Sequence, residues 1–171
     1  VSGAGTYGIA STAMNDEPTY AGFLAEITGF MAANAITSPD QVRALMRPEL
    51  FGYLESTLNS VTQTTEYFRL AFLLAGRRAE GTTFPSNITM TANALAAPTG
   101  TPLETELLFT TSTGGVAPVY VGLWGAVDVI RDPYSDAASG ALRLTALTTS
   151  DVTVARPAQL RLLTGVHLAA A

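Results

Sequence analysis

Two long segments with the alternation of extended strands, separated by a cluster of turn residues, constrain the fold of this chain more than any other feature. The first segment runs from Val119 to Ile130, and the second runs from Leu142 to Val154. Between them, Asp132 to Gly140 is rich in Asp, Ser, Pro and Gly, the residues that turns favour. A strand, a turn and a second strand of this length predict one long β-hairpin.

The first strand of this hairpin is expected to present two different faces, because successive side chains of a strand point to opposite sides. One face is aliphatic, and the other combines aromatic, aliphatic and acidic residues. The two sets are Val119, Val121, Leu123, Val127 and Val129, and Tyr120, Trp124, Asp128 and Ile130. Trp124, the only tryptophan, is expected by default to pack in a core, with a place at an interface as the alternative.

Helical spacing appears twice upstream of the hairpin. After Asp16-Glu17-Pro18, apolar residues recur three and four positions apart, which predicts a helix that ends near Asn34. Small residues share another side of this helix and would let a second element approach closely: Gly22, Ala25, Gly29 and Ala32. Val42 to Met46 predicts a short strand, and Pro48 suits the first position of a second helix. The buried face of that helix is expected to hold Leu50, Phe51, Leu54 and Leu58.

Other segments give weaker patterns. Val1 to Met14 is rich in glycine and small residues and is expected to be a loop. Tyr67 to Leu74 is almost entirely apolar, so its periodicity leaves a buried strand and a buried helix both open. Short strands are predicted around Phe84, at Ile88 to Met90 and at Glu106 to Thr110, and Pro157 to Val166 is expected to be a short final segment.

The composition excludes several kinds of chemistry. All nine basic residues are Arg, so the chain can form neither a P-loop of the GxxxxGK type nor a lysine Schiff base. Cysteine is absent and His167 is the only histidine, which excludes cysteine-based zinc sites and any multi-histidine site within one chain. His167 is expected to lie on an exposed tail. The net charge of −5 makes the chain a poor candidate for holding DNA by its phosphates.

Two patterns suggest function but favour structural interpretations. Gly3-Ala4-Gly5-Thr6-Tyr7-Gly8 fits GxGxxG, yet a dinucleotide site needs a helix directly after the glycines, and Pro18 comes too late. Asp128, Asp132 and Asp136 could pair for acid–base work or hold Ca²⁺, but aspartates in turns more often cap backbone groups. No catalytic residue, cofactor-binding residue or metal ligand is therefore assigned.

The sequence shows no sign of a membrane anchor or a leader. No apolar run reaches the length of about 20 residues that a membrane-spanning helix needs. The chain starts at Val1 and shows no signal-peptide pattern, so we expect its N-terminus to be a cut inside a longer protein. Only 13% of the residues are charged, which suits a subunit that hides much of its surface against neighbours, although a monomer with a Thr-rich surface would show a similar composition.

Four segments, in this order, resemble the later part of the Hong Kong 97 fold of tailed-phage major capsid proteins. They are the glycine-rich start with Gly3, Gly5, Gly8 and Ile9, the strand-to-helix step Ala44 to Pro48, the strand Gly122 to Asp132, and the closing strands Leu142 to Pro157. The resemblance implies an α+β fold in which a mixed sheet is flanked by two or three helices and a long β-hairpin projects. Residues 1–121 and 155–168 would form an axial-type domain, and residues 122–154 the hairpin of a peripheral domain.

The resemblance also implies a role. The chain would be a structural subunit of an icosahedral phage or prophage capsid shell, located in the virion and assembled in the host cytoplasm. It would have no enzymatic activity and no cofactor, and its partners would be other copies of itself. Encapsidated DNA would be contacted only indirectly, and neither a membrane nor a small-molecule substrate would be a partner. The shell of a nanocompartment or of a gene-transfer-agent particle is an alternative, and a fragment of a nucleotide-binding oxidoreductase is a remote one.

Five hairpin residues are the candidate subunit interface: Trp124, Asp128, Arg131, Asp132 and Tyr134. The N-terminal arm, extended loop and long spine helix that the family uses to clasp neighbours would lie upstream of residue 1. A chain without them is expected to fold its axial domain without closing a full shell. Its hairpin would then project or find a partner through its strand edges.

Overall fold

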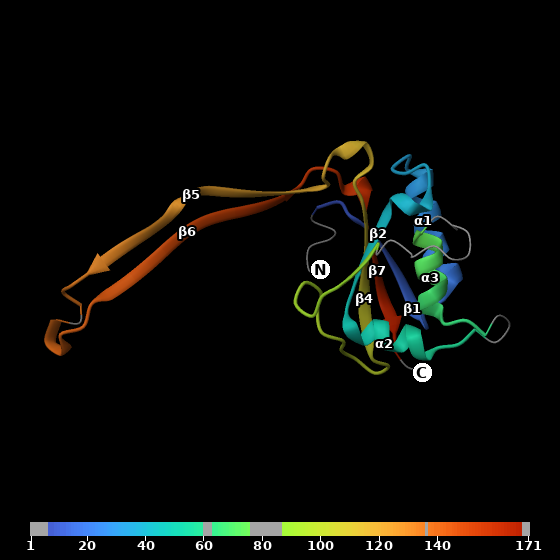
Figure 1. Ribbon diagram of the computed structural model, residues 1–171, viewed down its shortest axis with the longest axis horizontal. Coiled ribbons are helices and arrows are strands. Elements are labelled where there is room, and N and C mark those ends of the chain that lie inside the picture. The colour runs from blue at the N-terminus through green and yellow to red at the C-terminus, as the bar shows by residue number, and fades with distance from the viewer. Residues whose placement is uncertain (1–6, 60–62, 76–86, 136, 169–171) are drawn as a thin grey trace. The chain divides into compact units, whose positions relative to one another are not determined.

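The computed structural model describes residues 7–59, 63–75, 87–135 and 137–168, which form two compact units (Figure 1). The first unit comprises Val1–Pro118 and Arg156–Ala171, and the second comprises Val119–Ala155. Within the described residues, the first unit contains three α-helices and a mixed five-stranded sheet, and the second contains an antiparallel two-stranded sheet. The predicted α+β class is confirmed.

The sheet of the first unit has the order β1-β7-β4-β2-β3. Its strands are β1 (Ala10–Asp16), β2 (Val42–Met46), β3 (Ile88–Met90), β4 (Glu104–Thr111) and β7 (Leu160–His167). The pairs β1–β7 and β2–β3 are parallel, whereas β4 runs antiparallel to both β2 and β7. The chain therefore leaves this sheet after β4 to form the second unit and returns to lay β7 between β1 and β4.

Three expectations about this sheet were wrong. Part of the predicted loop Val1 to Met14 is β1, whose small polar residues lack the alternation that would identify a strand. The expected short final segment contains β7, an interior strand of the sheet. His167 belongs to this strand instead of an exposed tail, and its Nε2 lies 3.5 Å from Glu104 Oε1. The strand predicted around Phe84 falls outside the described residues.

The first predicted helix is confirmed as α1 (Tyr20–Ala32). The Thr19 hydroxyl caps its N-terminus by accepting a hydrogen bond of 3.3 Å from the Gly22 amide. The side of α1 that carries small residues contacts other elements, as predicted: Met14 of β1 lies against Gly22, and Arg161 of β7 lies against Gly29. A Cβ atom at Gly29 would lie 2.5 Å from Cζ of Arg161, so this glycine lets the arginine of β7 cross close to the helix.

The other two helices are α2 (Pro48–Ser56) and α3 (Glu66–Leu74). Pro48 opens α2 as predicted, and Leu50 and Leu54 are buried, but Leu58 lies beyond the end of the helix and is 57% exposed. The ambiguous apolar segment is the helix α3. The Thr65 hydroxyl caps it by accepting a bond of 3.1 Å from the Phe68 amide.

The main core lies between the helices and one face of the sheet. Figure 1 shows α1 and α3 beside this face. Phe23 of α1 packs edge-on against Phe109 of β4 with ring centroids 6.5 Å apart, and both side chains are fully buried. Glu26 of α1 is also buried, and its Oε2 accepts a hydrogen bond of 2.7 Å from Nε of Arg161. A pair of a buried carboxylate and a partly exposed guanidinium therefore joins α1 to β7.

Arg47, at the end of β2, holds the loop that follows β3. Its Nη1 donates to the carbonyl oxygens of Ala92 and Leu95, the second at 2.9 Å. Its Nε and Nη2 donate to the two carboxylate oxygens of Glu49 at 3.1 and 2.9 Å. This bidentate contact raises the pKa of Arg47 and lowers the pKa of Glu49. Leu95 is only 3% exposed, so the arginine fixes a loop that buries an apolar side chain.

The Glu26–Arg161 pair generates a prediction about stability. Arg161→Met should lower the free energy of unfolding by about 3 kcal/mol, because it leaves the Glu26 carboxylate buried without its partner. Adding Glu26→Leu should recover most of this loss, since the double variant buries no charge. Chemical denaturation measures both, with Arg43→Met as the control because Arg43 is exposed on β2. Equal stability of the Arg161→Met variant and the wild type would contradict this account.

Candidate subunit interface

The predicted hairpin forms the second unit. Strands β5 (Val119–Asp132) and β6 (Arg143–Val154) pair antiparallel, with Val121 opposite Val152 near one end of the ladder and Asp132 opposite Arg143 at the other. Residues opposite each other in a ladder share a face of the ribbon. This register therefore shows on which face of the hairpin each side chain lies.

One face of the hairpin, here called the aliphatic face, carries seven exposed aliphatic side chains. They are Val119, Val121, Leu123, Val127, Val129, Leu144 and Val152. Their exposed fractions range from 37% at Val119 to 74% at Leu123. The opposite face, here called the mixed face, carries Tyr120, Trp124, Asp128, Ile130, Leu147 and Asp151.

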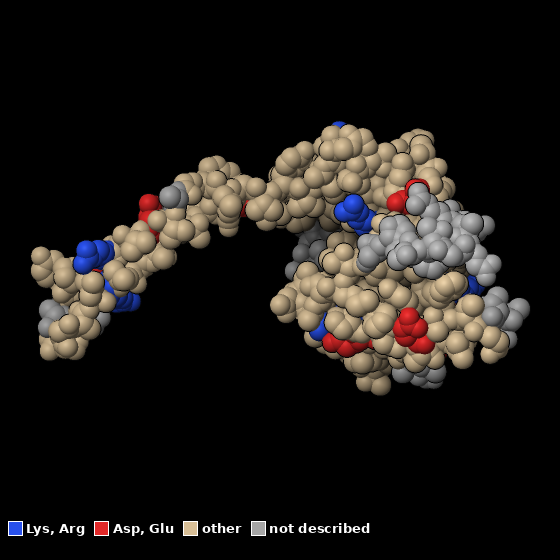
Figure 2. Space-filling model, viewed as in Figure 1, with Lys and Arg blue, Asp and Glu red and all other residues tan. Residues whose placement is uncertain are grey.

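Neither face is covered within the second unit. The unit consists of a single two-stranded sheet, so it has no second layer of secondary structure to cover either face. Burial is almost absent along both strands. On the face that Figure 2 shows, most of this ribbon is uncharged, and separate acidic and basic groups lie along it. Proteins that work as monomers rarely expose a continuous apolar surface of more than a few hundred Å². The hairpin therefore exposes large apolar side chains on both of its faces.

Trp124 lies on the mixed face and is 59% exposed, so the expectation that it packs in a core was wrong. A Cβ atom at Gly122 would lie 2.8 Å from Cη2 of Trp124, which places the indole over the glycine two positions earlier. The ring thus covers its own strand and leaves its other surface free for a partner.

The tip of the hairpin is organised by Asp132. Its Oδ1 accepts hydrogen bonds from the amides of Tyr134 at 2.9 Å and Ser135 at 3.1 Å, and its Oδ2 pairs with the Ser135 hydroxyl. The hydroxyl and the two amides lower the pKa of Asp132. The capping interpretation of this aspartate is confirmed. The same turn presents Tyr134, which is 85% exposed.

The structure separates the remaining candidate residues. Asp128 lies on the mixed face opposite Leu147, whereas Arg131 lies on the aliphatic face opposite Leu144. No ion pair joins either residue to another described side chain. Asp136 falls outside the described residues. The structure therefore does not test whether the three aspartates come together.

Two features of the hairpin were not predicted. The register shifts between Trp124 and Asp128, so that three residues of β5 bulge opposite one of β6, and Gly125 has a φ of 80° in this bulge. A glycine inside a strand pattern signals such a bulge and could have identified it. Arg143 was also missed, although it is a second arginine near the tip.

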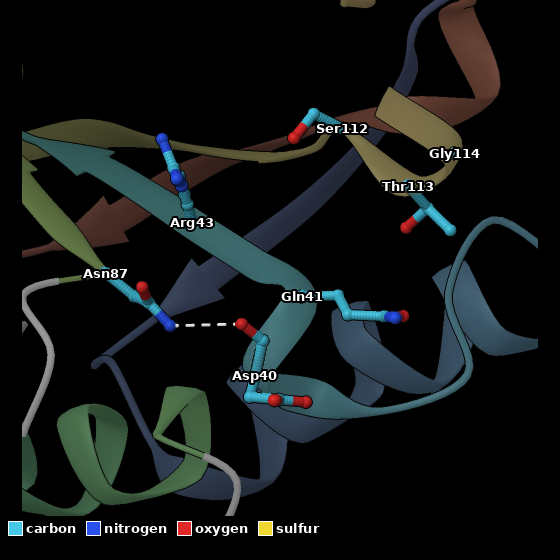
Figure 3. Close-up of a pocket in the computed structure, with 7 residues that line it drawn as sticks. All are labelled: Asp40, Gln41, Arg43, Asn87, Ser112, Thr113 and Gly114. Carbon is cyan, nitrogen blue, oxygen red and sulfur yellow. Dashed lines mark hydrogen bonds between the residues drawn. The ribbon is translucent and has the colours of Figure 1, made fainter. Parts of the chain in front are cut away.

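The first unit has a polar pocket of about 320 Å³, shown in Figure 3. It is lined by Asp40, Gln41, Arg43, Asn87, Ser112, Thr113 and Gly114. The Asn87 amide donates to the carbonyl oxygens of Asp40 at 3.2 Å and Leu74 at 2.8 Å, so this side chain holds backbone segments together. Figure 3 shows Arg43 and Asp40 pointing in different directions.

The glycine pattern at the N-terminus does not gain support as a nucleotide site. Gly3 and Gly5 lie outside the described residues, and Gly8 is followed by β1 instead of a helix. Among the residues that the structure describes, no group of three or more His, Cys, Asp or Glu side chains could hold a metal ion. No described helix is both long and apolar enough to cross a membrane.

Comparisons with known proteins were made by sequence and by structure. No protein-family model and no curated protein matches the sequence. A crystal structure of a virus-like particle from Pyrococcus furiosus matches with a TM-score of 0.53 and 12% identity, over 93% of this chain and 57% of that one. A structure of Mycobacterium phage Che8 matches with a TM-score of 0.55 and 16% identity, over 92% and 53%.

A capsid of an empty GTA particle matches less closely, with a TM-score of 0.48 and 14% identity, over 92% of this chain and 50% of that one. The chain thus spans only about half the length of the solved structures it resembles. At these identities the likeness concerns the fold, which is of a capsid type.

The Asp132 turn generates a prediction about pH. Because the folded-state pKa of Asp132 lies below its ordinary value, its carboxylate stabilises the turn above that ordinary value and loses this effect as the pH falls through the lowered pKa. The amide signals of Tyr134 and Ser135 should therefore shift together in NMR spectra as the pH falls from about 6 to about 2. Asp132→Asn should abolish the transition. Amide signals that shift equally in the wild type and the variant would contradict the assignment.

Proposed function

We propose that this chain belongs to a structural subunit of an icosahedral phage or prophage capsid with the Hong Kong 97 fold. The observation that carries the proposal is the likeness to the Pyrococcus furiosus virus-like particle and the Mycobacterium phage Che8 structure over more than nine-tenths of the chain. A likeness of that extent has to include most of the hairpin as well as the sheet. The sequence resemblance to tailed-phage capsid proteins supports the same assignment independently.

The proposal assigns a role to each unit. Residues 1–121 and 155–168 act as the axial-type domain, and residues 122–154 act as the hairpin of the peripheral domain. The boundaries between the compact units, at Val119 and Arg156, lie within a few residues of these limits. The aliphatic face of the hairpin then packs against the long helix that the resemblance places upstream in the same polypeptide.

The mixed face and the tip contact neighbouring subunits in this proposal. Trp124 and Tyr134 supply the large exposed aromatic surfaces that dominate the energy of many interfaces. Asp128 on the mixed face and Arg131, which belongs to the aliphatic face but lies next to the tip, are exposed and have no described ionic partner, so charges on a neighbour can pair with them. Asp132 acts indirectly, because its carboxylate holds the turn that presents Tyr134.

The proposed role requires contacts between proteins and no catalysis. A shell subunit encloses DNA without reading it, and a net charge of −5 is compatible with enclosure rather than phosphate binding. The subunit would be located in the virion capsid after assembly in the host cytoplasm. We assign it no cofactor, membrane or small-molecule partner.

The likeness to a virus-like particle also favours a second candidate, the shell of a protein nanocompartment. Both functions use a closed shell, and they differ in what the shell encloses. Purified particles that protect DNA from nuclease indicate a phage or gene-transfer-agent role, whereas particles that enclose an enzyme indicate a nanocompartment.

The shell function is tested by expressing the full-length gene that encodes this chain and examining the product by sedimentation and negative-stain electron microscopy. The wild type should form closed particles. Trp124→Asp should abolish them and leave a folded, unassembled subunit, because it places a charge at the centre of the mixed face.

Leu58→Asp is the matched control. Leu58 is 57% exposed, close to the 59% of Trp124, but lies in the first unit. This variant should assemble like the wild type. Failure of the wild type to form any particle would refute the shell function, and an undiminished particle yield from Trp124→Asp would refute the interface role of the hairpin.

A further inference from the structure

The two-stranded hairpin has two outer edges, and that of β6 is suited to accept a further strand. We propose that β6 pairs antiparallel with β6 of a second copy, so that two hairpins join into one four-stranded sheet. The contact is isologous, meaning that the same residues contribute from both copies. It goes beyond the proposed function, which uses the faces and the tip of the hairpin and not its edges.

The two edges of the hairpin differ in how well they are protected. Natural edge strands carry bulges, lysine or proline, or are very short. The edge of β5 is interrupted by the bulge between Trp124 and Asp128, where Gly125 has a φ of 80°. The sequence of β6, RLTALTTSDVTV, contains no lysine, proline or glycine, and every residue of it except Thr148 pairs with β5. Among the described residues no strand lies on the far side of β6, so this edge is long, regular and open.

A second copy would supply what the isolated ribbon lacks. A sheet of two strands is marginal by itself in water, and sheets of three or more strands are more stable. The outward-pointing amides and carbonyls of β6 would gain a second ladder of hydrogen bonds. The new strand would also cover part of Leu144, Leu147 and Val152, which are 60%, 52% and 48% exposed.

The charges of β6 lie symmetrically about Leu147. Arg143 lies four residues before it and Asp151 four residues after it, and these are the only charged residues of the strand. Neither of them forms an ion pair with another described residue. In an antiparallel pair centred on Leu147, Arg143 of each copy lies opposite Asp151 of the other. The contact therefore contains two cross-strand pairs of opposite charge.

This register keeps every side chain on a consistent face. Edge-to-edge pairing about a two-fold axis perpendicular to the sheet continues the mixed face of one copy into the mixed face of the other. Arg143, Leu147 and Asp151 are separated by even numbers of residues, so all three lie on the mixed face. On the same face Leu147 lies opposite Leu147, and Thr145 lies opposite Thr149. Threonines that face each other across a ladder pair favourably.

Charge selects this arrangement over the alternatives. In-register parallel pairing would place Arg143 beside Arg143 and Asp151 beside Asp151, and like charges directly opposite each other are destabilising. An antiparallel pair centred on Thr148 would leave both charged residues opposite threonines. A strand of unrelated sequence lacks this complementarity, so a second copy is the partner that β6 fits.

Cysteine cross-linking tests the register, because the chain contains no native cysteine. Residues directly opposite in a ladder lie within the Cα separation that a disulfide spans. Since Leu147 lies opposite itself, Leu147→Cys should give a disulfide-linked dimer on oxidation. Thr149→Cys is the matched control, because it lies on the same face of the same strand. The two copies of Thr149 are about 13 Å apart along the strand in this register, so this variant should not become linked.

Charge variants in the Leu147→Cys background test the two ion pairs. Arg143→Asp places an aspartate opposite Asp151, and Asp151→Arg places an arginine opposite Arg143. Either variant alone should therefore lose the link and fall to the level of Thr149→Cys. A mixture of the two should restore the link, because every opposite pair then joins unlike charges. Misfolding of either variant would not produce this restoration.

Three results would overturn the inference: no linkage of Leu147→Cys, equal linkage of Thr149→Cys, or a mixture of the charge variants that links no better than each alone. The outcome is distinguishable from that of the shell proposal. Particles of the full-length product whose Leu147→Cys variant gives no linkage would overturn this inference and leave the shell function standing. Linkage together with a failure to form particles would refute the shell function and leave this inference standing.

Discussion

A sheet or helix with an apolar side is stable when another layer of secondary structure covers that side. The two units of this chain differ in whether they contain such a second layer. In the first unit, the helices cover one face of the sheet, and Arg47 fixes a loop that buries Leu95. In the second unit, two strands provide two faces and nothing within the unit covers either of them. The described residues of the first unit therefore form a core, whereas no described residue of the second unit is buried.

Arginines show the same contrast in their contacts. Arg47 and Arg161 use the planar guanidinium to bind carboxylates and carbonyls inside the first unit, and Arg69 lies 4.7 Å from the ring centroid of Tyr20 while pairing with Glu66. On the hairpin, Arg131 and Arg143 have no described ionic partner. Arg47, Arg69 and Arg161 thus stabilise the fold of the first unit, whereas the exposed Arg43 of that unit and the two hairpin arginines take part in no described ion pair.

Periodicity predicted the parts of the fold whose sequence alternates with the spacing of a strand or a helix. The hairpin, α1, β2 and the start of α2 belong to this group. It could not identify β1, because Ala, Ser and Thr carry no apolar alternation, and it could not choose between strand and helix for α3, because nearly every residue there is apolar. Periodicity also could not predict that Trp124 is exposed. Burial depends on whether a second layer is present, and the sequence of one strand does not contain that information.

The indole of Trp124 is the only one in the chain, and it stands on the mixed face beside the bulge at Gly125. Its fluorescence therefore reports the surroundings of this one surface without contributions from the core of the first unit. An indole in contact with water emits at longer wavelengths than one covered by protein. The unlabelled chain thus carries its own optical indicator of whether the hairpin stands in solvent or against another protein surface.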